Sequence, residues 1–219
     1  MGGTTGSTGM RTAVTGEERA FLPGMTREWL LPLYDPVNRL LGVRRIRRRL
    51  LDQAGLQPGQ RVLEIGCGTG SLLLAAKQAQ PAAVIVGLDP DLAALARAQR
   101  KARRRHLAVQ LDRGYADELP YADDSVDVVL SSFMLHHVPA DQREPAMREV
   151  LRVLRPGGAL HLVDVGGPGE HGHRHRFTRE HAVDDVPDLL RRAGFAEVVE
   201  TRSDVHRWVG RFTSYRATA

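Results

Sequence analysis

The sequence predicts an α/β fold, in which a mostly parallel sheet is covered by helices on both faces. From residue 61 onward, short apolar runs alternate with amphipathic segments, and the first run, RVLEI, is followed at once by three closely spaced glycines. Strands that alternate with helices at this spacing are typical of parallel sheets. Hydrophobic residues make up 42% of the 219 residues, which is enough for one core. We therefore expect one doubly wound domain over residues 58–219.

The chain before this domain has a different character. Residues 1–16 are rich in glycine and threonine and show no periodicity, so we expect a disordered tail. Residues 17–57 are amphipathic but interrupted by prolines, which predicts short helices that form a cap or lid. Within this segment, Trp29 and Tyr34 are candidates for covering a ligand, with core packing as the alternative.

The helices and strands of the main domain are predicted from the spacing of apolar residues and from the glycines and prolines that interrupt it. Strands are expected at 61–65, 82–88, 107–111, 126–132 and 159–165, and helices at 71–79, 91–104 and 143–154. The run Pro156-Gly157-Gly158 is expected to end the third helix. The C-terminal part of the sequence predicts one more helix, which ends at Gly194, and then two paired strands.

The positive charge is carried almost entirely by arginine. The formal net charge is +5, and arginines gather at residues 44–49 and 103–105. A solvated face is the default for both clusters, and an anionic acceptor, a membrane surface or RNA is the alternative. Since the chain shows no dedicated RNA-binding module, we do not expect a nucleic-acid partner.

Two further features bear on location. No apolar run approaches the roughly 18 residues that a membrane helix needs, so we expect no membrane span. The single cysteine, Cys67, rules out an internal disulfide, and a reducing compartment is then the default. We therefore expect a cytoplasmic protein.

The glycines after the first strand predict a nucleotide site. Glycine permits positive φ and lets a ligand touch the backbone. The spacing Gly66, Gly68, Gly70 is not the dinucleotide fingerprint G-x-G-x-x-G, because Ser71 stands where the third glycine is required. A phosphate-binding P-loop is also absent. The loop is tight but not suited to a pyrophosphate, which disfavours a nicotinamide-dependent oxidoreductase.

A carboxylate, Asp89, ends the second strand. It can accept two hydrogen bonds from a ribose diol, as in dinucleotide folds. Asp89 followed by Pro90 also suits the start of a helix, with the proline at its first position. Both interpretations can hold together.

Four runs in order carry a resemblance to a known family. They are VLEIGCGTGSL, GLDPD, GYADELPYADDSVDVVLSSFMLHHV and REVLRVLRPGGALHLVDV. Together they resemble the class I S-adenosylmethionine-dependent methyltransferases, above all the small-molecule group that includes quinone-biosynthesis C-methyltransferases. The resemblance implies a Rossmann-like, seven-stranded sheet whose last strand is antiparallel and inserted near the edge, and S-adenosylmethionine as the cofactor.

The resemblance also implies roles for individual residues. The methionine part of the cofactor would be lined by Glu64, Gly66, Cys67, Gly68 and Gly70, with Glu64 facing the ammonium group. The ribose and adenine would be held by Asp89, Pro90, Ala116 and Asp117, with Ser131 closing the cofactor floor. Related enzymes often carry a carboxylate where this chain has Tyr115, which leaves open which side chain binds the adenine amine. For Cys67, packing is expected rather than catalysis.

Methyl transfer from a sulfonium needs mainly alignment and the exclusion of water, and alignment can lower a barrier by about 7–11 kcal/mol. A base is needed only where the acceptor must lose a proton. His136, which follows the fourth strand, is the candidate base, and a histidine bonded to backbone at a helix start is the alternative. His171, His173 and His175 predict a polar loop beside the acceptor pocket, and we expect no metal site.

These observations predict S-adenosylmethionine-dependent methyl transfer to a small organic acceptor, at carbon, oxygen or nitrogen. The alternatives are a non-catalytic protein that binds the cofactor, a nicotinamide-dependent oxidoreductase and an RNA methyltransferase. The sequence leaves the acceptor and the oligomeric state open.

Overall fold

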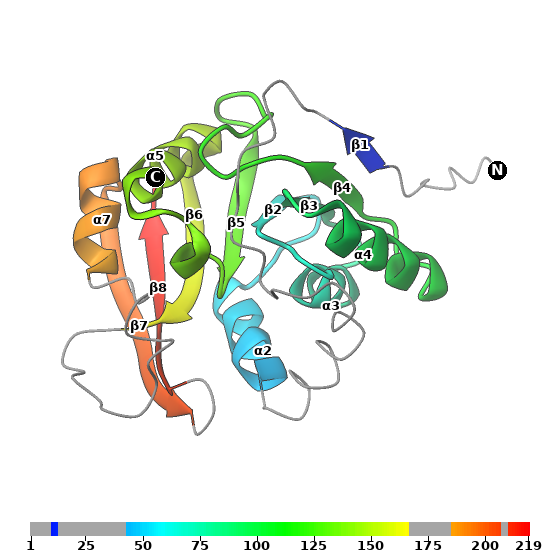
Figure 1. Ribbon diagram of the computed structural model, residues 1–219, viewed down its shortest axis with the longest axis horizontal. Coiled ribbons are helices and arrows are strands. Elements are labelled where there is room, and N and C mark those ends of the chain that lie inside the picture. The colour runs from blue at the N-terminus through cyan, green and yellow to red at the C-terminus, as the bar shows by residue number, and fades with distance from the viewer. Residues whose placement is uncertain (1–9, 13–42, 167–184, 207–209) are drawn as a thin grey trace.

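The computed structural model describes residues 10–12, 43–166, 185–206 and 210–219, and these form one sheet with helices on both faces (Figure 1). The helices are α2 (Val43–Ala54), α3 (Ser71–Ala79), α4 (Leu92–Arg104), α5 (Ala140–Val153) and α7 (Val186–Ala193), with a short 3-10 turn, η2 (Leu135–His137). The strands are β1 (Met10–Thr12), β2 (Arg61–Ile65), β3 (Val84–Asp89), β4 (Gln110–Arg113), β5 (Val126–Ser132), β6 (Leu154–Val165), β7 (Glu197–His206) and β8 (Gly210–Thr218).

The strand order confirms the predicted fold class. The sheet runs β1-β4-β3-β2-β5-β6-β8-β7, and all pairs up to β6 are parallel. The last strand, β8, lies between β6 and β7 and is antiparallel to both. Strands β2 to β8 are therefore the seven that were predicted, with the antiparallel strand next to the edge.

An eighth strand, β1, was not predicted. The expectation of a disordered tail over residues 1–16 does not hold for residues 10–12, which pair with the outer edge of β4. The remainder of that segment lies outside the described residues, as does most of the predicted cap over residues 17–57. An edge strand offers unpaired backbone groups, and three added residues satisfy some of them. Three residues are too few to give a periodic signal in a sequence.

Two predicted strands begin at clearly different residues. β4 begins at Gln110 rather than at residue 107, because the chain first closes α4 with a hydrogen bond from Leu107 N–H to the Ala102 carbonyl. β6 begins at Leu154 rather than at residue 159, and α5 ends just before it. Leu154 already pairs with β5, and the register shift that follows takes up the Pro-Gly-Gly run. That run therefore makes a bulge rather than a helix stop.

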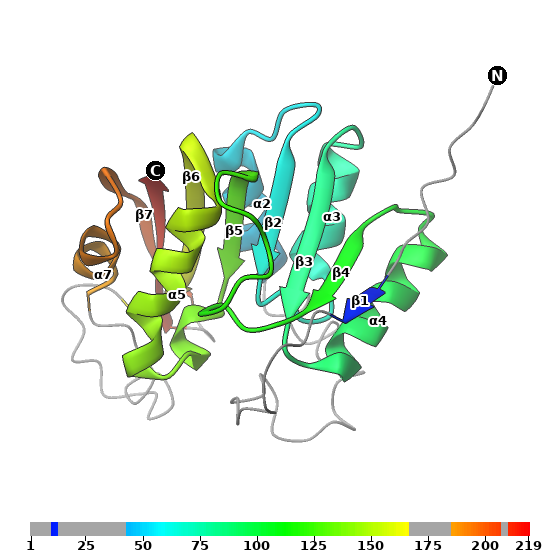
Figure 2. The same cartoon turned by 90° about the horizontal axis from the view of Figure 1, so that it is seen from above.

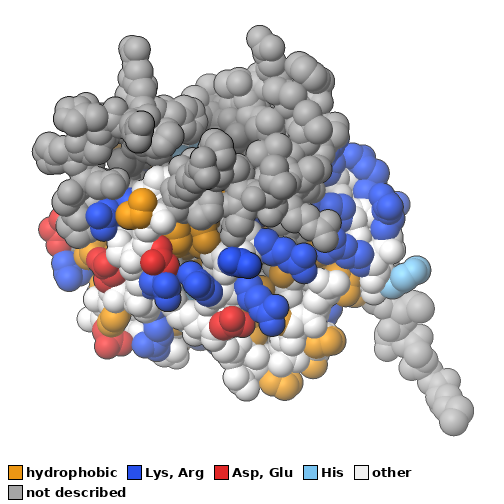
Figure 3. Space-filling model, turned by 90° about the horizontal axis from the view of Figure 1, so that it is seen from below, with side chains coloured by type: hydrophobic (Ala, Val, Ile, Leu, Met, Phe, Trp, Pro, Cys, Tyr) orange, Lys and Arg blue, Asp and Glu red, His pale blue; other side chains and the backbone are white. Residues whose placement is uncertain are grey.

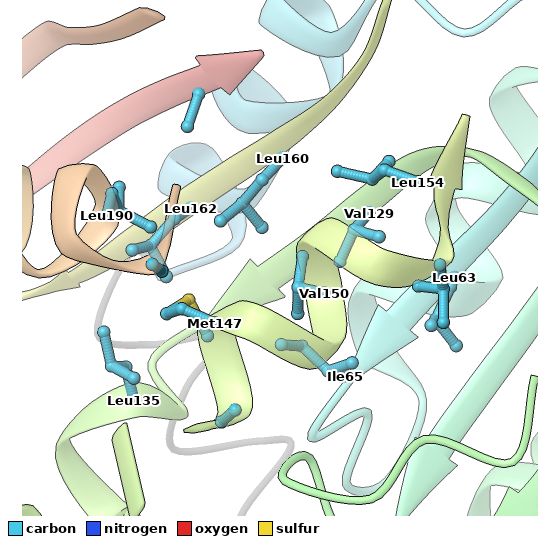
Figure 4. Packing of buried hydrophobic residues seen from close by; sticks show 14 of the residues in the cluster. Leu63, Ile65, Val129, Leu135, Met147, Val150, Leu154, Leu160, Leu162 and Leu190 are labelled. Carbon is cyan, nitrogen blue, oxygen red and sulfur yellow. The ribbon is translucent and has the colours of Figure 1, made fainter. Parts of the chain in front are cut away.

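The sheet separates two hydrophobic clusters. On one face, α5 and α7 pack against the central strands, and Figure 4 shows their leucine, valine and methionine side chains interlocking. On the other face lie α2, α3 and α4. Seen from above, α5 and α2 lie on opposite sides of the sheet (Figure 2). Because the central strands are buried on both faces, their sequences are continuous apolar runs rather than alternating ones.

The topology places a site at one edge of the sheet. β2 is paired with β3 on one side and with β5 on the other, so the order of the strands reverses there. Ligands of open α/β sheets bind at such a switch point, outside the carboxyl ends of the strands. The glycine loop after β2 and the segments after β3, β4 and β5 start from this edge.

Candidate active site

The three glycines after β2 serve two different purposes. All three have positive φ, at 65°, 51° and 73° for Gly66, Gly68 and Gly70. A Cβ on Gly66 would lie 2.1 Å from Met134 Cγ, and one on Gly70 would lie 2.9 Å from Ala98 Cβ. Among the described residues, a Cβ on Gly68 would meet nothing within 4 Å. Gly66 and Gly70 therefore allow close packing, whereas Gly68 exposes its backbone to open space, as a ligand cradle requires.

Asp89 closes this loop from β3. Its Oδ2 accepts a hydrogen bond from Gly68 N–H at 2.7 Å, and its Oδ1 accepts one from Asp91 N–H at 2.9 Å. The alternative that Asp89 caps α4 is wrong, because Asp91 is the N-cap and accepts from Ala93 N–H and Ala94 N–H. Burial raises the pKa of Asp89 to about 6, and its two backbone hydrogen bonds oppose that shift.

Glu64, next to the last residue of β2, is a buried carboxyl group with an unused oxygen. Only 3% of the residue is exposed, and Oε2 has no hydrogen-bond partner within the described part of the chain. Burial raises its pKa to about 8, while the positive charge of Arg47 pulls the pKa downward. Without a ligand, this carboxyl group is therefore mostly protonated at neutral pH.

Cys67 packs in the core, as predicted. The residue is 5% exposed, and its Sγ lies 2.9 Å from the position of a Cβ on Gly87. Burial raises the pKa of the thiol, and the nearby carboxylates of Asp89 and Glu64 raise it further. Since the thiolate is the nucleophilic form, this thiol is poorly suited to covalent catalysis.

The segment after β4 lies beside the end of β3. Gly114 N–H donates to the Asp89 carbonyl at 3.4 Å, and Arg113 Nε donates to the Pro90 carbonyl at 3.3 Å. Ala116 and Asp117, which come after Tyr115, are half-buried, and Ala116 packs against the core. The structure thus brings the predicted ribose and adenine residues to neighbouring strand ends.

At the end of β5, two serines differ in their surroundings. Ser131 is fully buried, and its Oγ has no partner among the described residues. Ser132 Oγ accepts a hydrogen bond from Arg47 Nε at 3.2 Å. Arg47 was expected to lie in a solvated cluster, but α2 instead turns this residue toward the strand ends.

The turn after β5 carries His136. Its Nδ1 lies 2.5 Å from Asp164 Oδ1, and both side chains are buried. The expectation of a histidine near this edge is met, while Asp164, Met134 and Arg47 were missed. The one sign of Asp164 in the sequence was an acidic residue near the end of the predicted strand that became β6. Met134 and Arg47 become visible only in three dimensions.

Several predicted features cannot be placed. Trp29, Tyr34 and the three histidines at residues 171, 173 and 175 lie outside the described residues. Within the described ranges, no group of three or more histidine, cysteine, aspartate or glutamate residues could hold a metal ion. The described helices are also all too short or too polar to cross a membrane.

The edge fits a ligand that is cationic and carries a ribose. Gly68 leaves room against its backbone. Asp89 uses two of the roughly four acceptor positions of a carboxylate, so that others remain for a diol. The unused oxygen of Glu64 suits an ammonium group. S-adenosylmethionine has these groups, and the residues present fit it.

The comparisons with known proteins define the class. Residues 62–158 match the sequence model of the methyltransferase domain family. The structure of a SAM-dependent methyltransferase from Aquifex aeolicus superposes with a TM-score of 0.69 at 19% identity, covering 89% of this chain and 99% of that one. The structural likeness shows the shared fold. The sequence match shows that residues 62–158 carry a methyltransferase domain, and together with the relatives below it makes the chain similar to the class I S-adenosylmethionine-dependent methyltransferases, whose cofactor is S-adenosylmethionine.

The relatives narrow the resemblance further. A demethylmenaquinone methyltransferase from Thermus thermophilus is 39% identical over 142 residues, which are 64% of this chain and 64% of the relative. One from Lactobacillus johnsonii is 35% identical over 144 residues, which are 63% of this chain and 58% of the relative. The chain thus resembles the quinone methyltransferases over less than two thirds of their length.

Proposed function

We propose that the chain transfers the methyl group of S-adenosylmethionine to a ring carbon of a small hydroxylated aromatic acceptor, such as a reduced naphthoquinone. The observation that carries the proposal is the open cradle over Gly68, with Asp89 bonded to its amide at the switch point of the sheet. The likeness to two demethylmenaquinone methyltransferases supports the choice of acceptor. We also assign the reaction to the cytoplasm, in keeping with the single cysteine.

In this proposal, the residues of β2 and β3 bind the polar ends of the cofactor. The carboxylate of Glu64 faces the ammonium group, whose charge favours the ionised form. Asp89 accepts hydrogen bonds from the ribose hydroxyls, and Pro90 flanks the adenine. The backbone of Gly68 lies against the methionine chain, and Gly66, Cys67 and Gly70 shape that wall.

The segments after β4 and β5 complete the binding site. Ala116 N–H donates to a ring nitrogen of the adenine, and Asp117 accepts from its exocyclic amine. Ser131, buried and with an unused hydroxyl, closes the floor of the cofactor site. The half-buried position of Ala116 and Asp117 beside β3 supports this arrangement.

When bound, S-adenosylmethionine supplies a methyl group that is already activated by its sulfonium. The residues of the chain then have to align the acceptor, exclude water and remove a proton. His136 is our candidate for the proton acceptor, because an unprotonated imidazole nitrogen is a good base near neutral pH. Its burial at the end of β5 supports this assignment.

Transfer of radiolabel tests the proposal. The full chain is incubated with S-adenosylmethionine labelled in the methyl group and with either 1,4-naphthalenediol or 1,4-naphthoquinone. We expect label in the diol product and little in the quinone product, because only the diol ring is electron-rich. Asp89→Asn is the matched control and should abolish labelling of both. Absence of label in the diol product despite cofactor binding would overturn the proposed acceptor, and label in added RNA alone would favour an RNA methyltransferase.

A further inference from the structure

A buried histidine–aspartate pair links the turn after β5 to β6. Asp164 Oδ1 lies 2.5 Å from His136 Nδ1 and accepts a hydrogen bond from Val165 N–H at 2.7 Å. Its Oδ2 accepts from His136 N–H at 3.3 Å. The His136 side chain is 9% exposed and that of Asp164 is 1% exposed. Three nitrogen atoms thus surround the carboxyl group of Asp164. This arrangement suits a carboxylate, because both of its oxygens accept hydrogen bonds and neither donates one.

The turn that carries His136 is held in a constrained conformation. Phe133 has a φ of 57°, which is uncommon for a residue with a side chain, and its N–H donates to the Val163 carbonyl at 2.8 Å. The next side chain, Met134, fills the space over Gly66. The turn is therefore fastened both to β6 and to the glycine loop. Strained backbone of this kind is often found at functional sites.

The pairing has a consequence for the imidazole. A carboxylate can only accept, so the shared proton belongs to His136 Nδ1. A neutral ring then carries a lone pair on Nε2, and no described residue donates a hydrogen bond to that nitrogen. Within the described chain, the titratable groups against the ring are Asp164 from β6 and His137, whose ring centroid is 4.0 Å away.

We propose that Asp164 is a positioning residue, which holds His136 in the tautomer with an unprotonated Nε2 so that this nitrogen takes a proton from the acceptor. The inference rests on the proposed function and deepens it. It assigns the acceptor to the class that must lose a hydroxyl proton to react. An acceptor that already offers a free electron pair at neutral pH, such as a thiolate, would have no use for the pair.

The proton and electron balance of the step is simple. His136 Nε2 takes the hydroxyl proton of the acceptor, and the electrons released into the ring form the new bond from a ring carbon to the methyl carbon. The bond between methyl carbon and sulfur breaks, and its electrons remain on sulfur as a neutral thioether. The ring carbon then loses its hydrogen as a proton while the oxygen regains one, so one proton is released overall.

The test combines two readouts on the full chain with Asp164→Asn. The first is a long-range proton–nitrogen spectrum of the imidazole rings without cofactor or acceptor. We expect His136 in the wild type to show a protonated Nδ1 and an unprotonated Nε2 when the ring is neutral. In Asp164→Asn this tautomer should no longer predominate, because an amide can also donate to Nδ1.

The second readout is the kinetics of methyl transfer to 1,4-naphthalenediol. Asp164→Asn should lower kcat by about 10²–10⁴-fold and leave KM for S-adenosylmethionine within about threefold. His136→Gln should lower kcat to a similar extent. His161→Gln, which removes another buried histidine from β6, is the control and should retain kcat within about threefold.

A wild-type His136 with its proton on Nε2, or an Asp164→Asn variant that keeps both tautomer and kcat, would overturn the inference. A purely structural pair would lower stability without changing the tautomer or separating kcat from KM. Failure of the proposed acceptor looks different, since the wild type would then bind S-adenosylmethionine but not label naphthalenediol. The tautomer readout needs no acceptor and decides the inference in that case too.

Discussion

Glu64 shows how one residue can be tuned by its surroundings. It lies near the carboxyl end of β2, where burial raises the pKa of its carboxyl group to about 8 and the charge of Arg47 opposes that shift. In the unfolded chain the same group titrates near its ordinary value of 4.5. The residue is therefore costly to ionise in the free protein and ready to ionise when a cation arrives beside it.

The sign of the resulting pH dependence follows from the raised pKa. The stabilising contribution of protonated Glu64 is complete below pH 4.5 and is lost as pH rises through about 8. Between about pH 6.5 and about pH 8.5, the free energy of unfolding of the wild type should fall by roughly 2 kcal/mol more than that of Glu64→Gln. Urea unfolding at the two pH values measures this difference.

The control for that prediction is Glu200→Gln, which removes an exposed carboxylate from β7. The free energy of unfolding of Glu200→Gln should change between the two pH values by as much as that of the wild type. An equal pH dependence in the wild type and Glu64→Gln would show that Glu64 is ionised in the free protein. Calorimetry in buffers of different ionisation enthalpy should also detect proton release when S-adenosylmethionine binds at pH 7.

The glycine loop combines tight packing at one glycine with a proposed binding surface at another. Gly55, Gly66 and Gly68 have similar positive φ values, but a Cβ would meet Met134 only at Gly66. Gly55→Ala measures the backbone strain alone, roughly 1–2 kcal/mol. Gly66→Ala should lower the free energy of unfolding clearly further, since Met134 and its turn have to move.

Gly68→Ala gives a separate prediction at the same element. Its stability should equal that of Gly55→Ala, because a Cβ there meets open space. Its affinity for S-adenosylhomocysteine should fall at least about tenfold, since the methyl group would fill the cradle. Titration calorimetry on both variants provides the comparison. Affinity of Gly68→Ala equal to that of Gly55→Ala would place the cofactor elsewhere.

Most of the helices and strands could be predicted from the sequence, but some of their boundaries and contacts could not. The helices α3, α4 and α7 and the strands β2, β5, β7 and β8 follow from local periodicity and from stops such as Gly194. The Pro-Gly-Gly run was misread, because the same residues serve a helix end or a bulge, and only pairing with β5 decides. Arg47 could not be separated from its arginine neighbours, because its role depends on how α2 faces the sheet.

For the molecule as a whole, the main question concerns its basic surface. Lysine and arginine side chains spread over the face shown in Figure 3. On α2, Val43, Ile46 and Leu50 are buried, whereas the neighbouring arginines at residues 44, 45 and 48 are exposed. This pattern is that of an amphipathic helix with a solvated charged face.

The triple variant Arg44→Gln, Arg45→Gln and Arg48→Gln tests whether that face has a function. We expect binding of S-adenosylhomocysteine and methylation of naphthalenediol to stay within about twofold of the wild type. Each substitution should change stability by no more than about 0.5 kcal/mol. If instead the variant loses a salt-dependent affinity for RNA together with its methyl-transfer activity, the small-molecule assignment is wrong.

The residues that we propose for cofactor binding were predictable to a greater extent than those that we propose for the acceptor. Glu64, Gly68 and Asp89 stand in motifs that are contiguous in sequence, and the structure brings them to one edge. Asp164 meets His136 across 28 positions of the chain, so no local pattern shows the pair. Such long-range contacts are set by strand order rather than by local spacing.

The most direct measurement of the central claim is thermal unfolding of the wild type and Asp89→Asn with S-adenosylmethionine, S-adenosylhomocysteine and NAD in parallel. A ligand at about 100 times its Kd stabilises by about 2.7 kcal/mol, which raises Tm by roughly 5–10 °C. We predict this shift for the wild type with both sulfur ligands, a much smaller shift for Asp89→Asn, and none with NAD. A shift with NAD alone, or no shift with either sulfur ligand at millimolar concentration, would contradict the account.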